Sequence, residues 1–179
     1  MKPIILIGMK ACGKSTIGNT LAKKLNLPFI ELDHEIEILH KDFKKENLSC
    51  RQIVNKYQQD YFRNMENLAL KKISLTRINS SFILACGGGT PINPQNRKIL
   101  KRLGTILYLK TDKSLILGRI KTEGKPSFFP KDKSLEEGLY LLLLERTEIY
   151  EKIADIIINI NNNDLNKTNS KIIKAISKI

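Results

Sequence analysis

The sequence predicts an α/β protein with a three-layer α/β/α fold, in which helices cover both faces of a central five-stranded parallel sheet. Short apolar runs rich in isoleucine alternate with longer segments of helical periodicity along the whole chain. Two of the clearest apolar runs end directly at glycine, which is typical of strands buried on both faces of a parallel sheet. The 179 residues are 41% hydrophobic and 27% charged, so we expect one domain with a substantial core over residues 1–179.

The chain begins with a strand, a helix and a second extended segment. The first strand, Ile4–Ile7, is wholly apolar and ends at Gly8. Apolar residues then recur at helical spacing over 14–25, and Pro28 is a stop signal for that helix. We expect the next extended segment to occupy residues 29–33.

The middle of the chain predicts helices before and after another buried strand. Residues 34–75 contain neither glycine nor proline and are expected to be helical. The apolar run 81–86 is a clear strand that again ends at glycine. A basic helix follows, reaches Leu103 and ends at Gly104, and the next strand covers 105–109.

The last third repeats the alternation around one long loop. Helical spacing at 115–120 gives way to residues 122–133, which hold a glycine, two prolines and several lysines and have no apolar periodicity. A loop of this length is often functional. A helix over 135–152, a strand over 155–160 and an amphipathic helix over 165–179 complete the pattern, which implies right-handed crossovers.

Residues 8–15, GMKACGKS, fit the phosphate-loop pattern G-x-x-x-x-G-K-[ST] between an expected strand and an expected helix. In such a loop, backbone N–H groups and the helix N-terminus surround a phosphate. Lys14 is expected to reach the β and γ phosphates of a nucleotide, and Ser15 to ligate Mg²⁺. The loop residues expected to bind the nucleotide are Gly8, Lys10, Ala11, Cys12, Gly13, Lys14, Ser15 and Thr16.

Polar and glycine residues follow two other expected strands. Glu31 and Asp33 end the second extended segment, and Gly87, Gly88 and Gly89 end the third. Because ligands bind at the carboxyl ends of parallel strands, these residues are expected to face the same crevice as the phosphate loop. Three successive glycines let a substrate lie against bare backbone, although a flexible connector is the alternative.

The charge and composition narrow the class of partner. The net charge of +13 favours nucleic acid, a membrane surface or a phosphorylated small molecule. Only 6% of residues are aromatic and none is tryptophan, which argues against a base-stacking surface, and we expect no nucleic acid partner.

No apolar run is long enough for a membrane span or a signal peptide, so we expect no membrane partner. Three scattered cysteines without a CxxC pair fit a reducing, cytoplasmic location.

Arginine is scarce, because only 7 of the 31 basic residues are arginine. The few that are present are therefore candidates for tasks that need a planar guanidinium, such as bidentate binding of a carboxylate or phosphate. Arg63 lies in the helical region, Arg119 just before the 122–133 loop, and Arg146 in the helix after it. We expect these three to belong to one site.

At these residues the chain resembles the shikimate kinases, small P-loop kinases of the nucleoside monophosphate kinase type. The combination of the glycine triplet with Asp33 and Arg63 is more specific than the phosphate loop, which many unrelated activities share. The resemblance covers nearly the whole chain. It rests on the phosphate loop, Asp33, Phe62-Arg63 with Glu66 one turn on, Gly87-Gly88-Gly89, the Lys125-Pro126 loop, and Arg146 followed by Ile149-Tyr150.

The resemblance implies ATP-dependent phosphorylation of shikimate to shikimate 3-phosphate by a monomer. It implies that Asp33 contacts the substrate hydroxyls, that Arg63 and Arg146 hold the carboxylate, and that the glycine triplet lines the pocket. Arg119 is expected beside the nucleotide, and the 122–133 loop is expected to close as a lid. The catalytic residues are then expected to be Lys14, Asp33 and the lid cation Lys125, with Ser15 and Glu31 at the metal.

Four departures from the family pattern leave other functions open. Glu31 stands where the family usually has Asp, Ala11-Cys12 replaces a pair that usually contains glycine, Cys86 replaces Thr, and Lys125 replaces the lid Arg. A lysine is a point charge without the arginine fork. The alternatives are a kinase of another hydroxylated acid or sugar, such as gluconate, or a nucleotide kinase, and a catalytically inactive nucleotide-binding or nucleic-acid-binding homologue.

Overall fold

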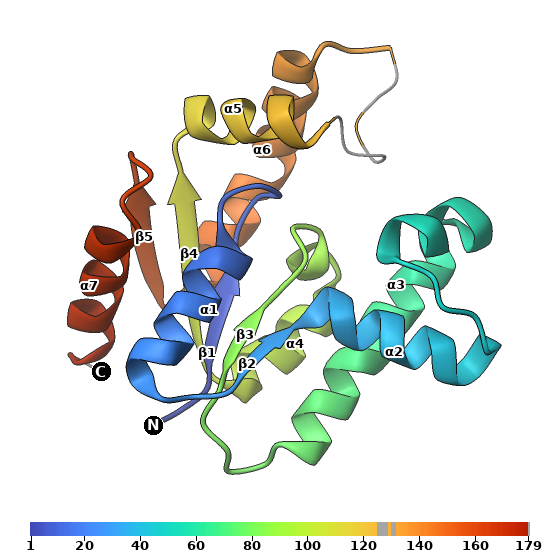
Figure 1. Cartoon of the computed structure of the whole chain (residues 1–179), viewed down its shortest axis with the longest axis horizontal. Helices are drawn as coiled ribbons and strands as arrows, with labels where there is room; N and C mark the ends of the chain where they lie inside the picture. Colours follow the sequence, from blue (N-terminus) through green and yellow to red (C-terminus); the bar gives the residue numbers. More distant parts are fainter. Residues whose placement is uncertain (125–128, 130–131, 179) are drawn as a thin grey trace.

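Five parallel strands form the central sheet of the protein, which a computed structural model describes over residues 1–124, 129 and 132–178 (Figure 1). Their order is β2-β3-β1-β4-β5, and all neighbouring pairs are parallel. The strands are β1 (Ile4–Ile7), β2 (Phe29–Glu31), β3 (Ile83–Ala85), β4 (Thr105–Thr111) and β5 (Ile156–Ile160). The predicted parallel sheet is therefore confirmed.

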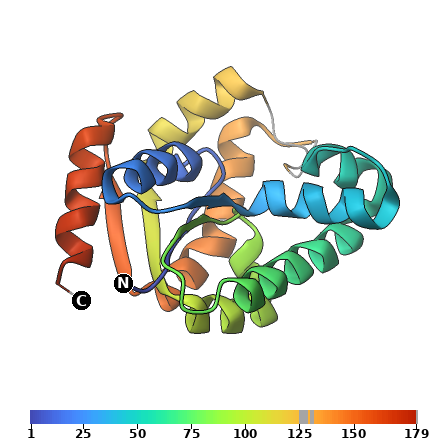
Figure 2. The same ribbon diagram turned by 60° about the horizontal axis from the view of Figure 1, so that its bottom comes forward.

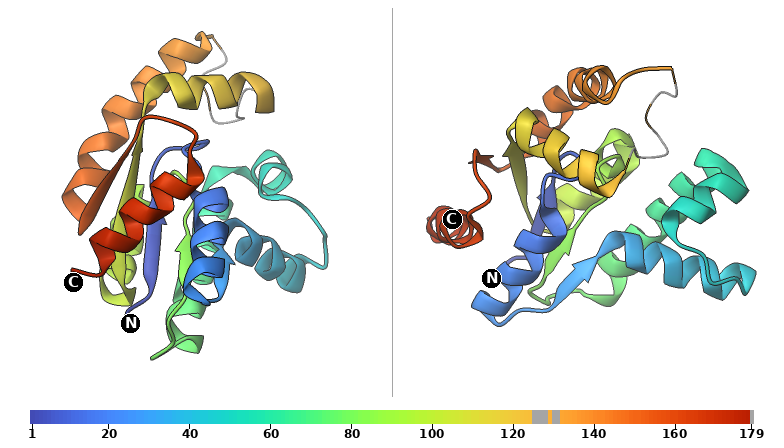
Figure 3. Two further views of the ribbon diagram at one scale, coloured as in Figure 1. Left: turned by 60° about the vertical axis from the view of Figure 1, so that its left-hand side comes forward. Right: turned by 45° about the horizontal axis from the view of Figure 1, so that its top comes forward.

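Helices pack on both faces of this sheet, as predicted (Figure 3). The helices of the described residues are α1 (Lys14–Leu25), α2 (Leu32–Lys44), α3 (Cys50–Thr76), the 3-10 helix η1 (Thr90–Ile92), α4 (Pro94–Leu103), α5 (Lys113–Glu123), α6 (Leu135–Ile153) and α7 (Leu165–Ile176). None of them is long and apolar enough to cross a membrane.

The alternating side chains of β1 divide the core into two clusters. Ile4 and Leu6 join one cluster, which includes residues of α1 and α7. Ile5 and Ile7 join the other, which includes residues of α3 and α4. Successive side chains of a strand point to opposite faces, so a wholly apolar run is what a central strand covered on both sides requires.

The helical region predicted over 34–75 is two helices that extend from the β2 edge of the sheet (Figure 2). Lys45, in the left-handed conformation, ends α2, and Ser49 begins α3 with a capping box. The second helix is broken within its length at Gln58, whose φ of 69° and ψ of 169° are not helical. Neither glycine nor proline marks these breaks, so residue type alone did not reveal them.

Several predicted boundaries differ from the structure by a few residues, and two of them lie near the site. The second extended segment ends at Glu31 rather than residue 33, because Leu32 is fully buried and begins α2 with an acidic first turn that suits a helix N-terminus. The helix expected at 115–120 continues to Glu123, so Thr122 is helical and the loop begins at Gly124. Most of that loop, including Lys125, lies outside the described residues.

Candidate active site

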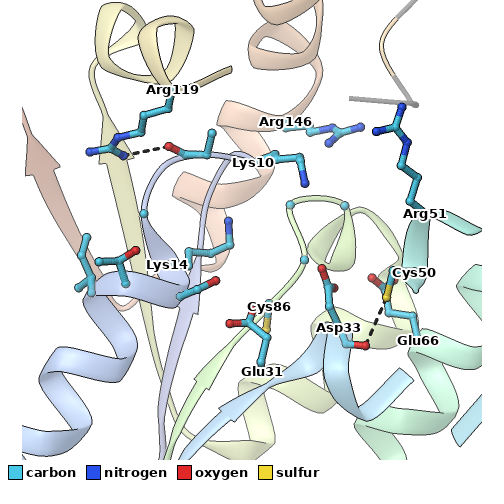
Figure 4. A pocket seen from close by; sticks show the side chains of 18 of the residues that line it. Lys10, Lys14, Glu31, Asp33, Cys50, Arg51, Glu66, Cys86, Arg119 and Arg146 are labelled. Atoms are coloured by element: carbon cyan, nitrogen blue, oxygen red, sulfur yellow. Dashed lines mark hydrogen bonds between the residues drawn. The ribbon is translucent and has the colours of Figure 1, made fainter. Parts of the chain in front are cut away.

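A cavity of about 620 Å³ opens at the carboxyl ends of β1, β2 and β3 (Figure 4). This edge is where ligands bind in open α/β sheets. The site residues predicted from sequence that line the cavity are Lys10, Ala11, Gly13, Lys14, Ser15, Thr16, Glu31, Asp33, Arg63, Gly87, Gly88, Gly89, Arg119 and Arg146. Gly8 and Cys12 belong to the loop but do not line the cavity. The structure thus brings segments from six regions of the chain to one place.

The phosphate loop turns sharply at both of its glycines. Gly8 has φ +145° and would bring an added Cβ to 2.9 Å from the carbonyl oxygen of Leu109, so the loop can pass there only without a side chain. Gly13 has φ +101° and precedes α1, whose N-terminus faces the cavity. The Lys14 ammonium lies inside the loop, where it donates to the carbonyl oxygens of Gly8 at 3.0 Å and Met9 at 2.8 Å.

Ala11 and Cys12 replace a pair that usually contains glycine in the phosphate loop of the family that the sequence resembles. Ala11 has φ 61°, in the left-handed region that glycine occupies with less strain. The thiol of Cys12 is fully buried and packs inside the loop, 3.6 Å from the Lys14 Nζ. Cys12 is therefore a small filler of the loop interior and not a reactive surface thiol.

Arg119 of α5 packs across the outside of the phosphate loop. Its guanidinium donates to the carbonyl oxygen of Ala11 at 2.9 Å and to Oδ1 of Asn163 at 2.7 Å. Asn163 and Leu165 also line the cavity. Sequence analysis missed both, because Asn163 sits in an Asn-rich stretch that is typical of a turn and only the fold brings it beside Arg119.

Ser15 and Glu31, the two predicted metal ligands, lie next to the loop lysine. Burial raises the pKa of the Glu31 carboxyl, while the neighbouring Ser15 hydroxyl and the Lys14 charge oppose that rise. The described residues contain no cluster of three or more His, Cys, Asp or Glu side chains that could hold a metal without help. A hydroxyl and a carboxylate beside a phosphate loop nevertheless fit Mg²⁺, which takes few protein ligands when phosphates complete its shell.

Asp33 occupies the first turn of α2 and faces the phosphate loop. Burial raises the pKa of its carboxyl, while the charges of Lys14 and Lys10 oppose that rise. A hydrogen bond holds the N-terminus of α3 next to Asp33: the Cys50 thiol donates to the Asp33 carbonyl oxygen at 3.2 Å (Figure 4). The Cys50 N–H also donates to the Glu37 carboxylate of α2 at 2.9 Å.

Arg63 is held by a buried carboxylate. Its guanidinium donates to both oxygens of Glu66, at 2.9 and 3.0 Å, and the Glu66 side chain is only 1% exposed. Burial raises the pKa of Glu66, and the Arg63 charge opposes that rise. An added Cβ on Gly89 would lie 2.3 Å from the Arg63 guanidinium, so this glycine is required for the arginine to occupy its place.

A buried polar network supports Glu66 from behind. The Thr90 hydroxyl donates to Glu66 at 2.8 Å, and the Asn96 amide donates to Glu66 and to the Thr90 carbonyl oxygen, both at 3.1 Å. Asn67 donates in turn to Asn96 at 2.8 Å. Nothing in the sequence marks Thr90, Asn96 and Asn67 as site residues, because their polar types are common on surfaces and only tertiary packing buries them.

Arg146 reaches the cavity from the opposite side, on α6. Its side chain is largely buried, at 9% exposure, and points over the glycine triplet (Figure 4). One turn further along α6, the Tyr150 hydroxyl donates to the Gly88 carbonyl oxygen and fixes the triplet to this helix. The structure therefore places Arg63, Arg146 and Asp33 around one cavity with the glycine triplet.

Comparison with known proteins identifies the family. The model of the family described as shikimate kinase matches residues 10–177. The chain belongs to the shikimate kinase family. A shikimate kinase of Clostridium botulinum (strain Loch Maree / Type A3) is 38% identical over 164 residues, which cover 90% of this chain and 89% of that protein. One from Thermoanaerobacter pseudethanolicus is 32% identical over 176 residues, covering 98% and 96% of the two chains.

Solved shikimate kinase structures share the fold over the whole chain. The structure from Acinetobacter baumannii, in complex with shikimate, has a TM-score of 0.86 at 29% identity and covers 99% of this chain and 94% of its own. The structure from Aquifex aeolicus has a TM-score of 0.78 at 30% identity, covering 98% and 96%. The resemblance inferred from the sequence is confirmed, and with it the fold class and the assignment as a phosphotransferase.

Proposed function

We propose that this shikimate kinase family member transfers the γ-phosphoryl group of ATP to a hydroxyl of shikimate and forms shikimate 3-phosphate. The observation that carries the proposal is one cavity in which a phosphate loop faces a buried carboxylate and two arginines. Shikimate carries one carboxylate and three hydroxyls. Arg63 and Arg146 would bind the carboxylate, and Asp33 the hydroxyls, so that these groups fix the orientation of the ring.

The chemistry that these residues support is positioning and charge stabilisation. Asp33 would accept a hydrogen bond from the attacking hydroxyl and orient it toward the nucleotide. The Lys14 ammonium and the backbone N–H groups of the loop would stabilise the negative charge of the moving phosphoryl group. Arg119, which packs on Ala11, would sit beside the nucleotide. Glycines 87–89 would let the ring approach bare backbone.

The metal has a defined place in this proposal. Ser15 and Glu31 would hold Mg²⁺, Glu31 through a water, because their oxygens lie together beside Lys14. When bound, the metal supplies positive charge that neutralises the phosphate oxygens. The longer side chain of Glu31, compared with the Asp that is usual in the family, extends further toward that position.

We also propose that the protein acts as a monomer in the cytoplasm. The residues of the cavity named above all come from a single chain, so the proposed site needs no second copy. The three cysteines are free, as expected where thiols stay reduced and ATP is available. A sedimentation velocity measurement that found a stable dimer as the active species would contradict the monomer.

An ADP-release assay tests the proposed reaction. With Mg-ATP present, we expect turnover that depends on shikimate and exceeds turnover with gluconate. Arg63→Ala should raise the KM for shikimate and leave ATP affinity nearly unchanged, because the arginine faces the acceptor. Arg77→Ala, which alters the exposed C-terminal end of the same helix, is the matched control. Gluconate turnover without shikimate turnover would favour another sugar-acid kinase instead.

A further inference from the structure

We propose that Arg51 is a third arginine of the acceptor pocket, which binds the carboxylate of the substrate together with Arg63 and Arg146. The inference rests on the proposed function and adds to it a specificity-determining residue. Arg51 lines the cavity and extends from α3 toward the side reached by Arg146 of α6 (Figure 4).

Arg51 gains no stability from the dipole of its helix. It is the second residue of α3, immediately after the first-turn residue Cys50 and two residues after the N-cap Ser49. The N-terminal turn of a helix carries partial positive charge and favours anionic side chains, so an arginine there is at the less favourable end. The helix dipole therefore does not account for a cation at this position.

Among residues 1–124, 129 and 132–178, Arg51 also has no neutralising partner. Within the described residues it makes no ion pair or hydrogen bond through its side chain. Two acidic side chains of the cavity have other neighbours: Glu66 binds Arg63 at 2.9 Å, and Glu31 lies near Ser15 and Lys14. Asp33 lies in the fields of Lys14 and Lys10. Arg51 and Arg146 are like charges that line one cavity, so an anion bound between them would be attracted by both.

The elements around Arg51 place it at the acceptor end rather than the phosphate end. The phosphate end is formed by the loop and by Arg119 of α5. Arg51 instead shares α3 with Arg63, and the preceding Cys50 is bonded to the Asp33 carbonyl oxygen at 3.2 Å. Val54, one turn along the same helix, adds an apolar side chain to this part of the lining. A carboxylate on a hydroxylated ring fits these surroundings better than a polyphosphate does.

Calorimetry on the full chain tests the inference, with shikimate and ATP titrated separately. Arg51→Ala should weaken shikimate binding by about tenfold and leave ATP affinity unchanged, since a hydrogen bond to a charged group has roughly that effect. Arg51→Lys should recover part of the loss, because the charge returns without the fork. The exposed Arg77→Ala on the same helix is the control and should change neither affinity.

Two further readouts separate direct contact with the ligand from a structural role and from long-range attraction. The unfolding temperature of Arg51→Ala should not fall, because the change removes a cation from a helix N-terminus, whereas a structural role would lower it. The ratio of shikimate affinities between the unmodified protein and Arg51→Ala should persist at 0.5 M salt, where the screening length is roughly 4 Å. A difference caused by long-range attraction alone would disappear at that salt concentration.

The outcomes are distinguishable from failure of the proposed function. If the unmodified protein neither binds nor phosphorylates shikimate, the proposed function fails. If it does both, and Arg51→Ala binds shikimate equally well, the inference about Arg51 is overturned alone. Loss of ATP affinity with unchanged shikimate affinity would place Arg51 at the phosphate end and would also overturn it.

Discussion

Gln58 shows how a single residue can interrupt a helix. Its φ of 69° and ψ of 169° fall in a region that only glycine adopts easily, and they divide α3 between the segment carrying Arg51 and the segment carrying Arg63. The break turns the two segments so that both face the cavity. The sequence contains no signal for it, because glutamine favours helix.

Replacing Gln58 with glycine should stabilise the protein. Relief of the backbone strain should exceed the entropy that glycine adds to the unfolded chain, for a net gain of about 1 kcal/mol. A thermal melt should show a rise of roughly 2–4 °C for a protein of this size. Asn79→Gly is the matched control, since Asn79 has a similar φ of 63° but asparagine tolerates that region better, so its gain should be smaller. An unchanged melting temperature for Gln58→Gly would contradict the claim that the backbone at Gln58 is strained.

The ionisation of Asp33 predicts a pH dependence. Burial raises the pKa of this carboxyl, so the ionised form that would accept a hydrogen bond from the hydroxyl is lost at a higher pH than for an exposed aspartate. The positive charge of Lys10 opposes that rise. Lys10→Ala should therefore move the acidic limb of the profile of kcat/KM for shikimate to higher pH.

A pH series of kcat/KM checks this expectation, because that parameter reports the free enzyme. Lys23→Ala, at the exposed C-terminal end of α1, is the control and should leave the acidic limb in place. A shift toward lower pH in Lys10→Ala, or no shift, would mean that the Lys10 charge does not act on Asp33. A change in ATP affinity alone would not move the limb.

At the scale of elements, two helical glycines with the same propensity cost have opposite surroundings. An added Cβ on Gly18 of α1 would lie 2.5 Å from the Phe29 ring and 3.0 Å from Leu6, where the helix packs on the sheet. An added Cβ on Gly118 of α5 would meet nothing within 4 Å. Close packing explains the first glycine, and no contact in the described structure explains the second.

The same substitution at the two glycines should have opposite signs. Gly18→Ala should lower the free energy of unfolding by about 1–3 kcal/mol through overpacking against β2. Gly118→Ala should raise it by about 0.5–1 kcal/mol, because alanine is the better helix former and has room. Denaturant titration measures both. Equal changes in the free energy of unfolding for the two variants would contradict the prediction, because α1 could then move away from Phe29 without loss of stability.

The start of α3 depends on a side-chain cap that the pattern of apolar residues did not reveal. The capping box at Ser49 and Gln52 begins α3 at the residue that puts Arg51 beside the cavity. The short α2–α3 connection was hidden inside a long polar region, whereas the start of α1 was evident from the phosphate loop. Helix boundaries that depend on side-chain caps are therefore less visible than those that depend on glycine.

At the scale of the whole molecule, the fold collects charge that the sequence spreads out. The net charge of +13 comes from 31 basic and 18 acidic residues along the entire chain. Six cations nevertheless line one cavity: Lys10, Lys14, Arg51, Arg63, Arg119 and Arg146. Such a cavity suits two anionic substrates, and the remaining positive field would raise the rate at which they arrive.

The sequence by itself determined the α/β class, the central strand, the phosphate loop and the family, because each depends on residues that are close together in the chain. Tertiary structure alone decided the break at Gln58, the network behind Glu66 and the place of Arg51. These depend on packing between elements far apart in sequence, and a polar residue carries no local sign of being buried. The scarcity of arginine in the sequence indicated Arg63, Arg119 and Arg146 as site candidates. Arg51 is equally scarce in type, but only the packing of α3 against α2 places it at the cavity.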